Sequence, residues 1–169
     1  MNLERALRME HSKAQCDKIV KWIGDDKVRF AELMNLFFGG EYRITQRAAW
    51  PMSYCVRHHA SLVKPYFKKL LDELEMKTGH PAAKRNIVRL FQFVEIPKRY
   101  QGRLMSICFG FIESPEGAIA VKAFSLTILE NLCKQYPEIL GEIKTIINTR
   151  WEQETPAFRS RAKKILNKK

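Results

Sequence analysis

The sequence lacks the features that mark several large classes of protein. It has no apolar run near the roughly 20 residues of a membrane-spanning helix, so we expect no membrane protein. Residues 1–15 are dotted with charges and lack the apolar segment of a secretory signal, which favours a cytoplasmic location. No glycine-rich phosphate loop and no nucleophile elbow is present, so the sequence indicates neither a cofactor nor a catalytic motif.

Potential metal ligands and catalytic acids are also scarce. The four cysteines form no Cys-x-x-Cys pair, which argues against a zinc or thioredoxin-type site. We expect them to be inert core thiols in a reducing compartment. Cys55 and His59 have the i, i+4 spacing that lets a helix hold a metal, but no further ligands follow, so no metal site is predicted. Aspartate occurs only as Asp17, Asp25, Asp26 and Asp72.

Helical periodicity is what the sequence does contain. Apolar residues recur at i, i+3, i+4 and i+7 over most of the chain, and no stretch alternates as a strand would. This pattern predicts an all-α protein. We expect helices over residues 3–23 (as one or two), 27–38, 43–58, 61–76, 82–95, 98–113, 118–134, 137–152 and 156–167. The predicted core includes Phe37, Phe67, Leu70, Ile87, Phe91, Ile107, Phe111, Phe124, Ile128, Ile143 and Ile147.

The breaks between these helices recur at a nearly constant interval. Turn-forming residues lie near 39–42, 78–81, 114–117 and 154–156. A basic residue follows each break, and these residues are 38, 37 and 39 residues apart: Arg47, Arg85, Lys122 and Arg161. A period near 40 with two helices is typical of helical-repeat arrays. One such hairpin cannot bury its apolar face alone, so neighbours must stack, and we expect one repeat domain over residues 1–169.

Residues 30–56 carry a family resemblance. An apolar helix and a Gly-containing turn precede a helix that opens with Arg43, Gln46, Arg47, Ala48 and Ala49. This pattern resembles a boundary between HEAT repeats, and the likeness extends over roughly residues 28–166. It implies a right-handed α-α superhelix of stacked antiparallel hairpins whose second helices line the concave surface. Two prolines depart from the pattern: we expect Pro51 to bend or restart its helix and Pro97 to break the second hairpin.

Positive charge is unevenly distributed. The formal net charge is +12, and asymmetry of this kind suggests a polyanionic partner. Lys64 and Lys68 are i, i+4 in one predicted second helix, and Arg99 and Arg103 are i, i+4 in the next. If the hairpins stack as the resemblance implies, the four residues form a basic stripe that could follow a phosphate backbone. The alternative is that they only solubilise exposed helix faces.

The function that the sequence favours is a non-catalytic scaffold that binds a protein or peptide. HEAT surfaces most often bind proteins, and no aromatic residues interleave with the basic stripe to stack on bases. The alternative is a nucleic-acid or other polyanion binder that uses the stripe. A remote third is an enzyme similar to the HEAT-like alkylpurine DNA glycosylases, which use a concave acidic residue with aromatic neighbours. Asp72, with Trp50 or Trp151, is the only combination that could serve in this way.

Overall fold

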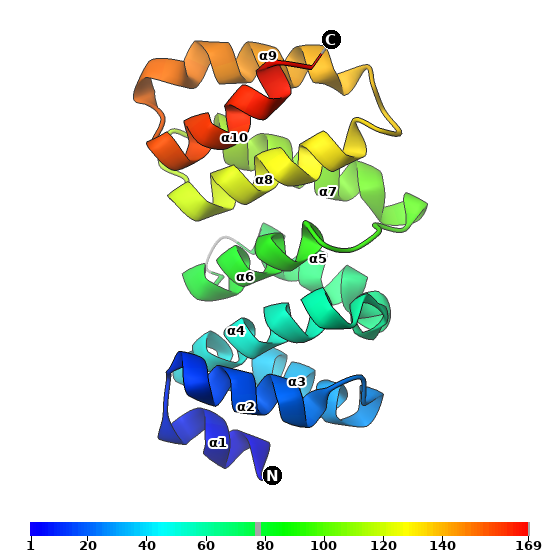
Figure 1. Ribbon diagram of the computed structural model, residues 1–169, viewed down its shortest axis with the longest axis vertical. Coiled ribbons are helices and arrows are strands. Elements are labelled where there is room, and N and C mark those ends of the chain that lie inside the picture. The colour runs from blue at the N-terminus through cyan, green and yellow to red at the C-terminus, as the bar shows by residue number, and fades with distance from the viewer. Residues whose placement is uncertain (77–78, 169) are drawn as a thin grey trace. The chain divides into compact units, whose positions relative to one another are not determined.

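The computed structural model describes residues 1–76 and 79–168, and its regular secondary structure over this part of the chain is all helical. The α-helices are α1 (Leu3–Met9), α2 (Lys13–Ile23), α3 (Lys27–Gly39), α4 (Tyr42–His58), α5 (Phe67–Glu75), α6 (Pro81–Phe91), α7 (Lys98–Glu113), α8 (Ile119–Leu132), α9 (Ile139–Arg150) and α10 (Pro156–Leu166) (Figure 1). Two 3-10 helices complete the set, η1 (Ala60–Tyr66) and η2 (Trp151–Gln153). The all-α prediction is confirmed. Within the described ranges, no helix has the length and apolar character needed to cross a bilayer.

The chain forms two compact units, Met1–Glu95 (unit 1) and Ile96–Lys169 (unit 2). In unit 1, the long helix α4 is central: α2, α3 and α6 all pack against it, and α5 packs against α6. In unit 2, α8 packs between α7 and α10, and α10 also contacts α9. Each helix therefore buries one face against its neighbours within its own unit, as an array of hairpins requires.

The helix starts follow from capping residues in the sequence. The Asp26 carboxylate accepts hydrogen bonds from the backbone N–H groups of Val28 and Arg29 at 2.8 and 3.1 Å, so it caps α3. At α6, the His80 Nδ1 atom accepts from the Ala82 N–H at 3.0 Å, and Pro81 occupies the first helical position. These caps place the starts of α3 and α6 within one residue of the predicted boundaries.

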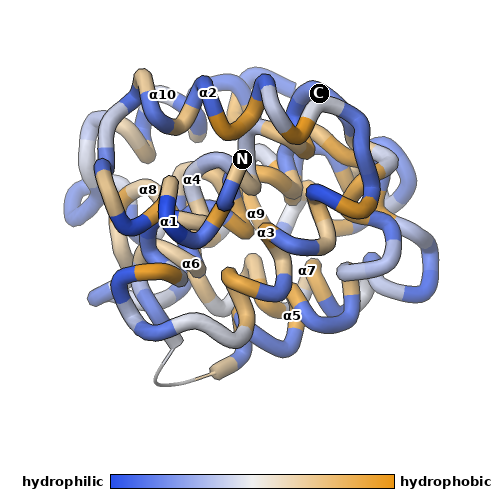
Figure 2. The backbone as a smooth tube through the Cα atoms, turned by 90° about the horizontal axis from the view of Figure 1, so that it is seen from below, coloured by the Kyte–Doolittle hydropathy of each residue, from blue (hydrophilic) through white to orange (hydrophobic). Residues whose placement is uncertain are grey.

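The buried residues agree with most of the predicted core. Phe37, Phe67, Leu70, Ile87, Phe91, Ile128, Ile143 and Ile147 are all buried. The rings of Phe67 and Phe91 stack with their centroids 5.7 Å apart, which joins α5 to α6. Figure 2 shows the underlying pattern, with orange hydrophobic and blue hydrophilic segments succeeding one another within single helices.

Three predicted core residues are only half-buried, namely Ile107, Phe111 and Phe124. In α7 the buried apolar residues are Leu104, Cys108 and Ile112, which are spaced by four. Helical periodicity predicts an apolar stripe wider than the face that packing encloses, so residues at the edge of the stripe were assigned wrongly.

Predictions about two helices that contain a proline also require correction. Pro51 does not restart its helix, because α4 is continuous from Tyr42 to His58 and its buried face runs through this position. The helix predicted over 61–76 is not uniformly α-helical: it opens as the 3-10 helix η1, which contains Pro65, and becomes α5 at Phe67. Proline has no N–H to donate, which favours a short irregular turn at this point. Pro97 ends the break between α6 and α7, as predicted.

Candidate functional site

A cleft of about 290 Å³ lies between the outward faces of α4 and α6 in unit 1, and we call it the α4–α6 cleft. From α4, the side chains of Gln46, Trp50 and Tyr54 line it, at i, i+4 and i+8. Residues with this spacing share one face of a helix. Ala48, Ala49 and Met52 face the other way and are buried, so packing of the core fixes the direction of the three lining residues.

The α6 wall is built in the same way. Ala82, Arg85, Asn86 and Arg89 line the cleft, and His11 closes one end from the segment between α1 and α2. The opposite face of α6 is buried in the core of unit 1. Arg85 and Arg89 are i, i+4, so both guanidinium groups belong to the same face.

Aromatic rings and cations interleave across this cleft. The Arg89 guanidinium lies 4.8 Å from the centroid of the Tyr54 ring, and its Nη2 donates to the Tyr54 hydroxyl at 3.1 Å. The Lys13 ammonium lies 4.9 Å from the same ring centroid. The Trp50 ring meets the His11 ring edge-on at 5.5 Å. Tyr54 is therefore a platform between two cations, and the cleft walls are held in place by contacts within unit 1.

Asn86 anchors the floor of the cleft. It is buried, its Nδ2 donates to the Ala82 carbonyl at 2.9 Å, and its Oδ1 accepts from the Ser53 hydroxyl at 3.3 Å. An amide nitrogen carries two protons, so Asn86 has one further donor beyond the bond to Ala82.

The lining of the cleft is electrostatically one-sided. It contains two arginines and a histidine but no carboxylate. The Asp17 carboxylate, on α2, forms an ion pair with the Lys13 ammonium of the same helix. Arg85 is exposed, whereas Arg89 is half-buried. The arrangement can accept an anionic group, because two guanidinium groups line a cleft whose own lining includes no carboxylate.

Four basic residues follow the breaks of the repeat at equivalent positions: Arg47, Arg85, Lys122 and Arg161. Arg85 differs from the other three in what it contacts. The Arg47 Nη1 donates to the carbonyls of Leu7 and Arg8 at the end of α1. In unit 2, Lys122 is buried against Glu154, and Arg161 donates to the Thr127 hydroxyl.

Each of those three residues has a structural role in its own unit. Arg85 stands at the same phase of the repeat but is exposed at the cleft. Arg47 caps the end of α1, and the position one repeat later in the chain lies inside α4. The carbonyls of α4 are in helical hydrogen bonds there, so Arg85 has no equivalent helix end to cap.

The predicted binding residues of unit 1 lie elsewhere. Lys64 is exposed in η1, and Lys68 is exposed in α5, so the two are on consecutive helices and not on one α-helix. The Lys68 ammonium forms a 2.9 Å ion pair with the Asp72 carboxylate. Asp72 therefore partly neutralises this part of the predicted stripe.

The other two predicted residues belong to unit 2. Arg99 and Arg103 both lie on α7, where Arg99 is exposed and Arg103 is half-buried. The Arg99 guanidinium lies 4.8 Å from the ring centroid of its neighbour Tyr100. The two pairs are in different units, so their alignment into a single stripe stays a prediction.

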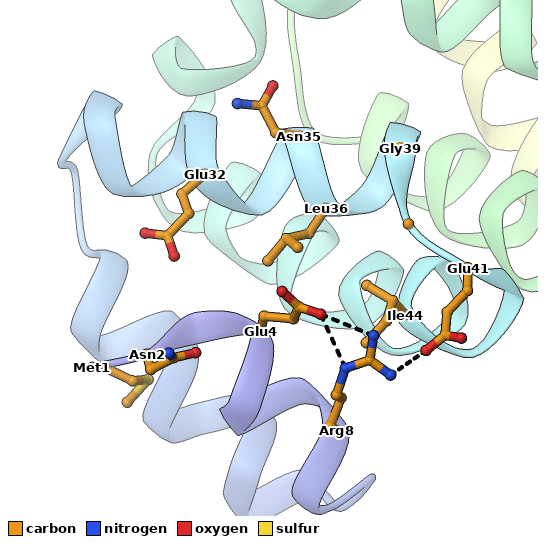
Figure 3. Close-up of a pocket in the computed structure, with 11 residues that line it drawn as sticks. Met1, Asn2, Glu4, Arg8, Glu32, Asn35, Leu36, Gly39, Glu41 and Ile44 are labelled. Carbon is orange, nitrogen blue, oxygen red and sulfur yellow. Dashed lines mark hydrogen bonds and ion pairs between the residues drawn. The ribbon is translucent and has the colours of Figure 1, made fainter.

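A second, wider pocket of about 890 Å³ is formed by α1, α3 and the start of α4 (Figure 3). Glu4, Glu32 and Glu41 line it together with Arg8. Arg8 hydrogen-bonds to both Glu4 and Glu41, as the dashed lines in Figure 3 mark. These two carboxylates therefore have a cation within the pocket, and the site lacks the one-sided charge of the α4–α6 cleft.

The cysteines have the surroundings of structural thiols. Cys16, Cys55 and Cys108 are buried, Cys133 is half-buried, and all four are free. Burial raises the pKa of Cys16 to about 11 and the pKa values of Cys55 and Cys108 to about 12. Such thiols stay protonated at neutral pH and are poor nucleophiles and metal ligands. Across residues 1–76 and 79–168, no three His, Cys, Asp or Glu side chains are grouped as a metal site would need.

The aromatic residues considered for a glycosylase site have other surroundings. Trp50 lines the α4–α6 cleft against His11, and Trp151, in unit 2, lies under the Arg159 guanidinium at 5.5 Å. The Asp72 carboxylate, in α5, pairs with Lys68.

The all-helical fold and the family match define a helical-repeat scaffold or binding module. The chain belongs to the HEAT repeat domain family, since the model of that family matches residues 3–169. This match confirms the resemblance read from the segment after Gly40. No curated protein and no solved structure matches the chain significantly.

Proposed function

We propose that this chain is a non-catalytic scaffold module that recognises a protein or peptide partner through the α4–α6 cleft. The observation that carries the proposal is the composition of the cleft: Trp50, Tyr54 and Arg89 meet there. Tryptophan, tyrosine and arginine are the residue types that dominate the binding energy of protein interfaces. Members of the HEAT repeat family commonly mediate protein interactions, which supports the same reading.

The pre-organisation of the cleft adds to this support. Tyr54 is held by Arg89, and Trp50 by His11, so a partner would meet side chains that are already ordered. Fixing side chains before binding reduces the entropic cost of association. The four free thiols fit a reducing compartment, which supports a cytoplasmic location.

Site-specific photo-crosslinking in cells tests the proposal. A photoreactive phenylalanine analogue replaces Gln46, which is exposed at the cleft, and in a control it replaces Lys18, which is exposed on α2 and lines neither pocket. The Gln46 position should trap a discrete protein that the Lys18 position does not, and Trp50→Ala should remove that adduct. Adducts that are the same at both positions, or that survive Trp50→Ala, would refute a protein site in the cleft.

A second candidate function is the binding of nucleic acid or another polyanion by Lys64, Lys68, Arg99 and Arg103. The net charge of +12 and the exposure of Lys64, Lys68 and Arg99 favour it. Binding of duplex DNA and RNA is measured at two salt concentrations, where log affinity falls with log salt by about 0.9 per phosphate neutralised on duplex DNA. Lys68→Ala and Arg103→Ala should each reduce that slope by about one, whereas Lys18→Ala should leave it unchanged. A slope that neither variant alters dismisses the stripe.

A further inference from the structure

The size of the α4–α6 cleft restricts what can enter it. At about 290 Å³ it lies at the lower limit of the roughly 300–1,000 Å³ typical of small-molecule sites. A single long side chain of a partner fits this volume. Under the proposed function, the occupant is one projecting group of a partner protein.

The charges select the sign of that group. Arg85 is exposed and Arg89 is half-buried, and both line a cleft without a carboxylate. A guanidinium has five N–H donors, and the bond from Arg89 to the Tyr54 hydroxyl uses one of them. The remaining donors suit a planar carboxylate, which arginine binds in a two-pronged arrangement.

The aromatic side chains of the cleft favour an incoming side chain with an apolar stem before its charged end. Trp50 and Tyr54 form the opposite wall, and both are half-buried. Arg89 and Lys13 already lie over the Tyr54 ring, whereas the Trp50 ring meets His11 only edge-on. The Trp50 ring can therefore cover the methylene groups of an incoming side chain while its charged end reaches the arginines. An apolar stem with an anionic end describes glutamate, and aspartate with a shorter stem.

The position of Arg85 in the repeat gives independent support. Arg47, Lys122 and Arg161, at the same phase, are each engaged with their own unit. Arg85 is the exposed member of this set. Its place over the cleft is therefore not explained by the structural role that this phase of the repeat serves elsewhere.

We infer that the α4–α6 cleft is an anchor pocket for an acidic side chain, in which Arg85 and Arg89 bind the carboxylate of a glutamate or aspartate from a partner protein. The inference rests on the proposed function and names the chemistry of its partner: an acidic segment whose anchor residue enters between Trp50 and Arg85. Asn86, with its further amide proton, is a third donor at the floor of the pocket.

The test uses the full chain and a fluorescein-labelled peptide of alternating glutamate and serine, with the matching glutamine peptide as its neutral counterpart. Fluorescence anisotropy at physiological salt measures the affinities. Arg85→Gln should weaken the glutamate peptide about tenfold, the size of a lost hydrogen bond to a charged group. Lys18→Gln removes the same charge from an exposed site on α2 outside the cleft, and it should change the affinity less than twofold.

A second readout reports on the pocket directly. In ¹⁵N spectra, the Nε–H signals of Arg85 and Arg89 and the indole N–H signal of Trp50 should shift with saturation as the glutamate peptide is added. The glutamine peptide should leave these signals unchanged. This measurement locates binding in the cleft even if a variant is poorly folded.

Several outcomes would overturn the inference. Equal losses for Arg85→Gln and Lys18→Gln would mean that the peptide senses only the overall charge. Binding of a phosphoserine peptide or of RNA at the cleft, without binding of the glutamate peptide, would assign the pocket to a different anion. Failure of the glutamate peptide together with a Gln46 crosslink to a protein would reject the acidic anchor while the proposed function stands. Loss of the crosslink as well would reject both.

Discussion

The buried ion pair of unit 2 offers the sharpest test of how this fold is held together. The Lys122 ammonium, on α8, lies 2.7 Å from the Glu154 carboxylate just before α10, and both side chains are 4% exposed. The Arg150 Nε lies 2.8 Å from the same carboxylate, and its Nη1 donates to the Glu113 carbonyl at the end of α7. One carboxylate therefore joins α8, α9 and the approach to α10.

Glu154→Gln keeps the shape of this side chain and removes its charge. Lys122 is then left buried without a counter-ion, whereas Arg150, at 13% exposure, can turn toward solvent. Removal of one partner from a buried pair typically costs about 3 to 5 kcal/mol, because desolvation of the remaining charge is no longer offset. We expect Glu154→Gln to lower the free energy of unfolding by this amount.

Replacement of both charges should be far less harmful. In Lys122→Met with Glu154→Leu, no buried charge of this pair remains, and such exchanges are often neutral or stabilising. Glu142→Gln serves as the control. Because Glu142 is exposed on α9, this substitution should change the free energy of unfolding by no more than about 0.5 kcal/mol. Urea unfolding followed by circular dichroism gives the free energies, and hydrogen exchange shows whether the loss is confined to unit 2.

Two results would contradict this role of the ion pair: a cost of less than about 1 kcal/mol for Glu154→Gln, or a double variant as unstable as the single one. The first result would mean that water or a local rearrangement solvates Lys122. The second would mean that the packing of the two side chains, and not their charge, is what unit 2 requires.

Three further predictions concern single residues. Phe91→Ala should cost about 3 to 5 kcal/mol in urea unfolding, because the ring is 1% exposed and stacks on Phe67; a cost below 1 kcal/mol would contradict that packing. Burial lowers the pKa of His80, whose neutral Nδ1 accepts from Ala82, so its contribution to stability is complete above pH about 6.5 and is lost as the pH falls from there through the lower folded pKa. His80→Asn, which caps without titrating, should flatten that pH dependence between pH 7.5 and 5.5. At pH 8 a thiol reagent should modify Cys133 first in the folded protein and the three buried cysteines only on unfolding, and equal rates for all four would refute their assigned burial.

The fold could be predicted because its signals are local. Apolar spacing, a cap such as Asp26 and a proline such as Pro97 each act within a few residues, and each determines where a helix starts or stops. The predicted starts and ends therefore lie within a few residues of the observed ones, except at η1. There Pro65 sets a 3-10 turn that the apolar period alone does not distinguish from an α-helix.

The limits of the core were harder to predict, because burial depends on neighbours from distant parts of the sequence. Phe124 satisfies the helical pattern of α8 yet is half-buried, and the Arg161 guanidinium lies 5.5 Å from its ring centroid. Lys122, two residues earlier, is charged and was assigned by its phase to a basic series, yet it is buried. Neither outcome follows from hydropathy. The position of Glu154 determines the burial of Lys122, and the position of Arg161 determines the surroundings of Phe124.

The candidate site escaped prediction for a related reason. The i, i+4 pairs Trp50–Tyr54 and Arg85–Arg89 are visible in the sequence, but each is an ordinary exposed helix face until the register between α4 and α6 is known. The sequence pointed instead to Lys64, Lys68, Arg99 and Arg103, where like charges recur at i, i+4. Packing of α6 against α4 brings rings and cations together. The contact of Arg89 with the Tyr54 ring, beside that of Lys13, depends on this packing. In a repeat protein the stacking that builds the core also builds the binding surface, so a cation with no structural role in its own repeat is where recognition should be sought.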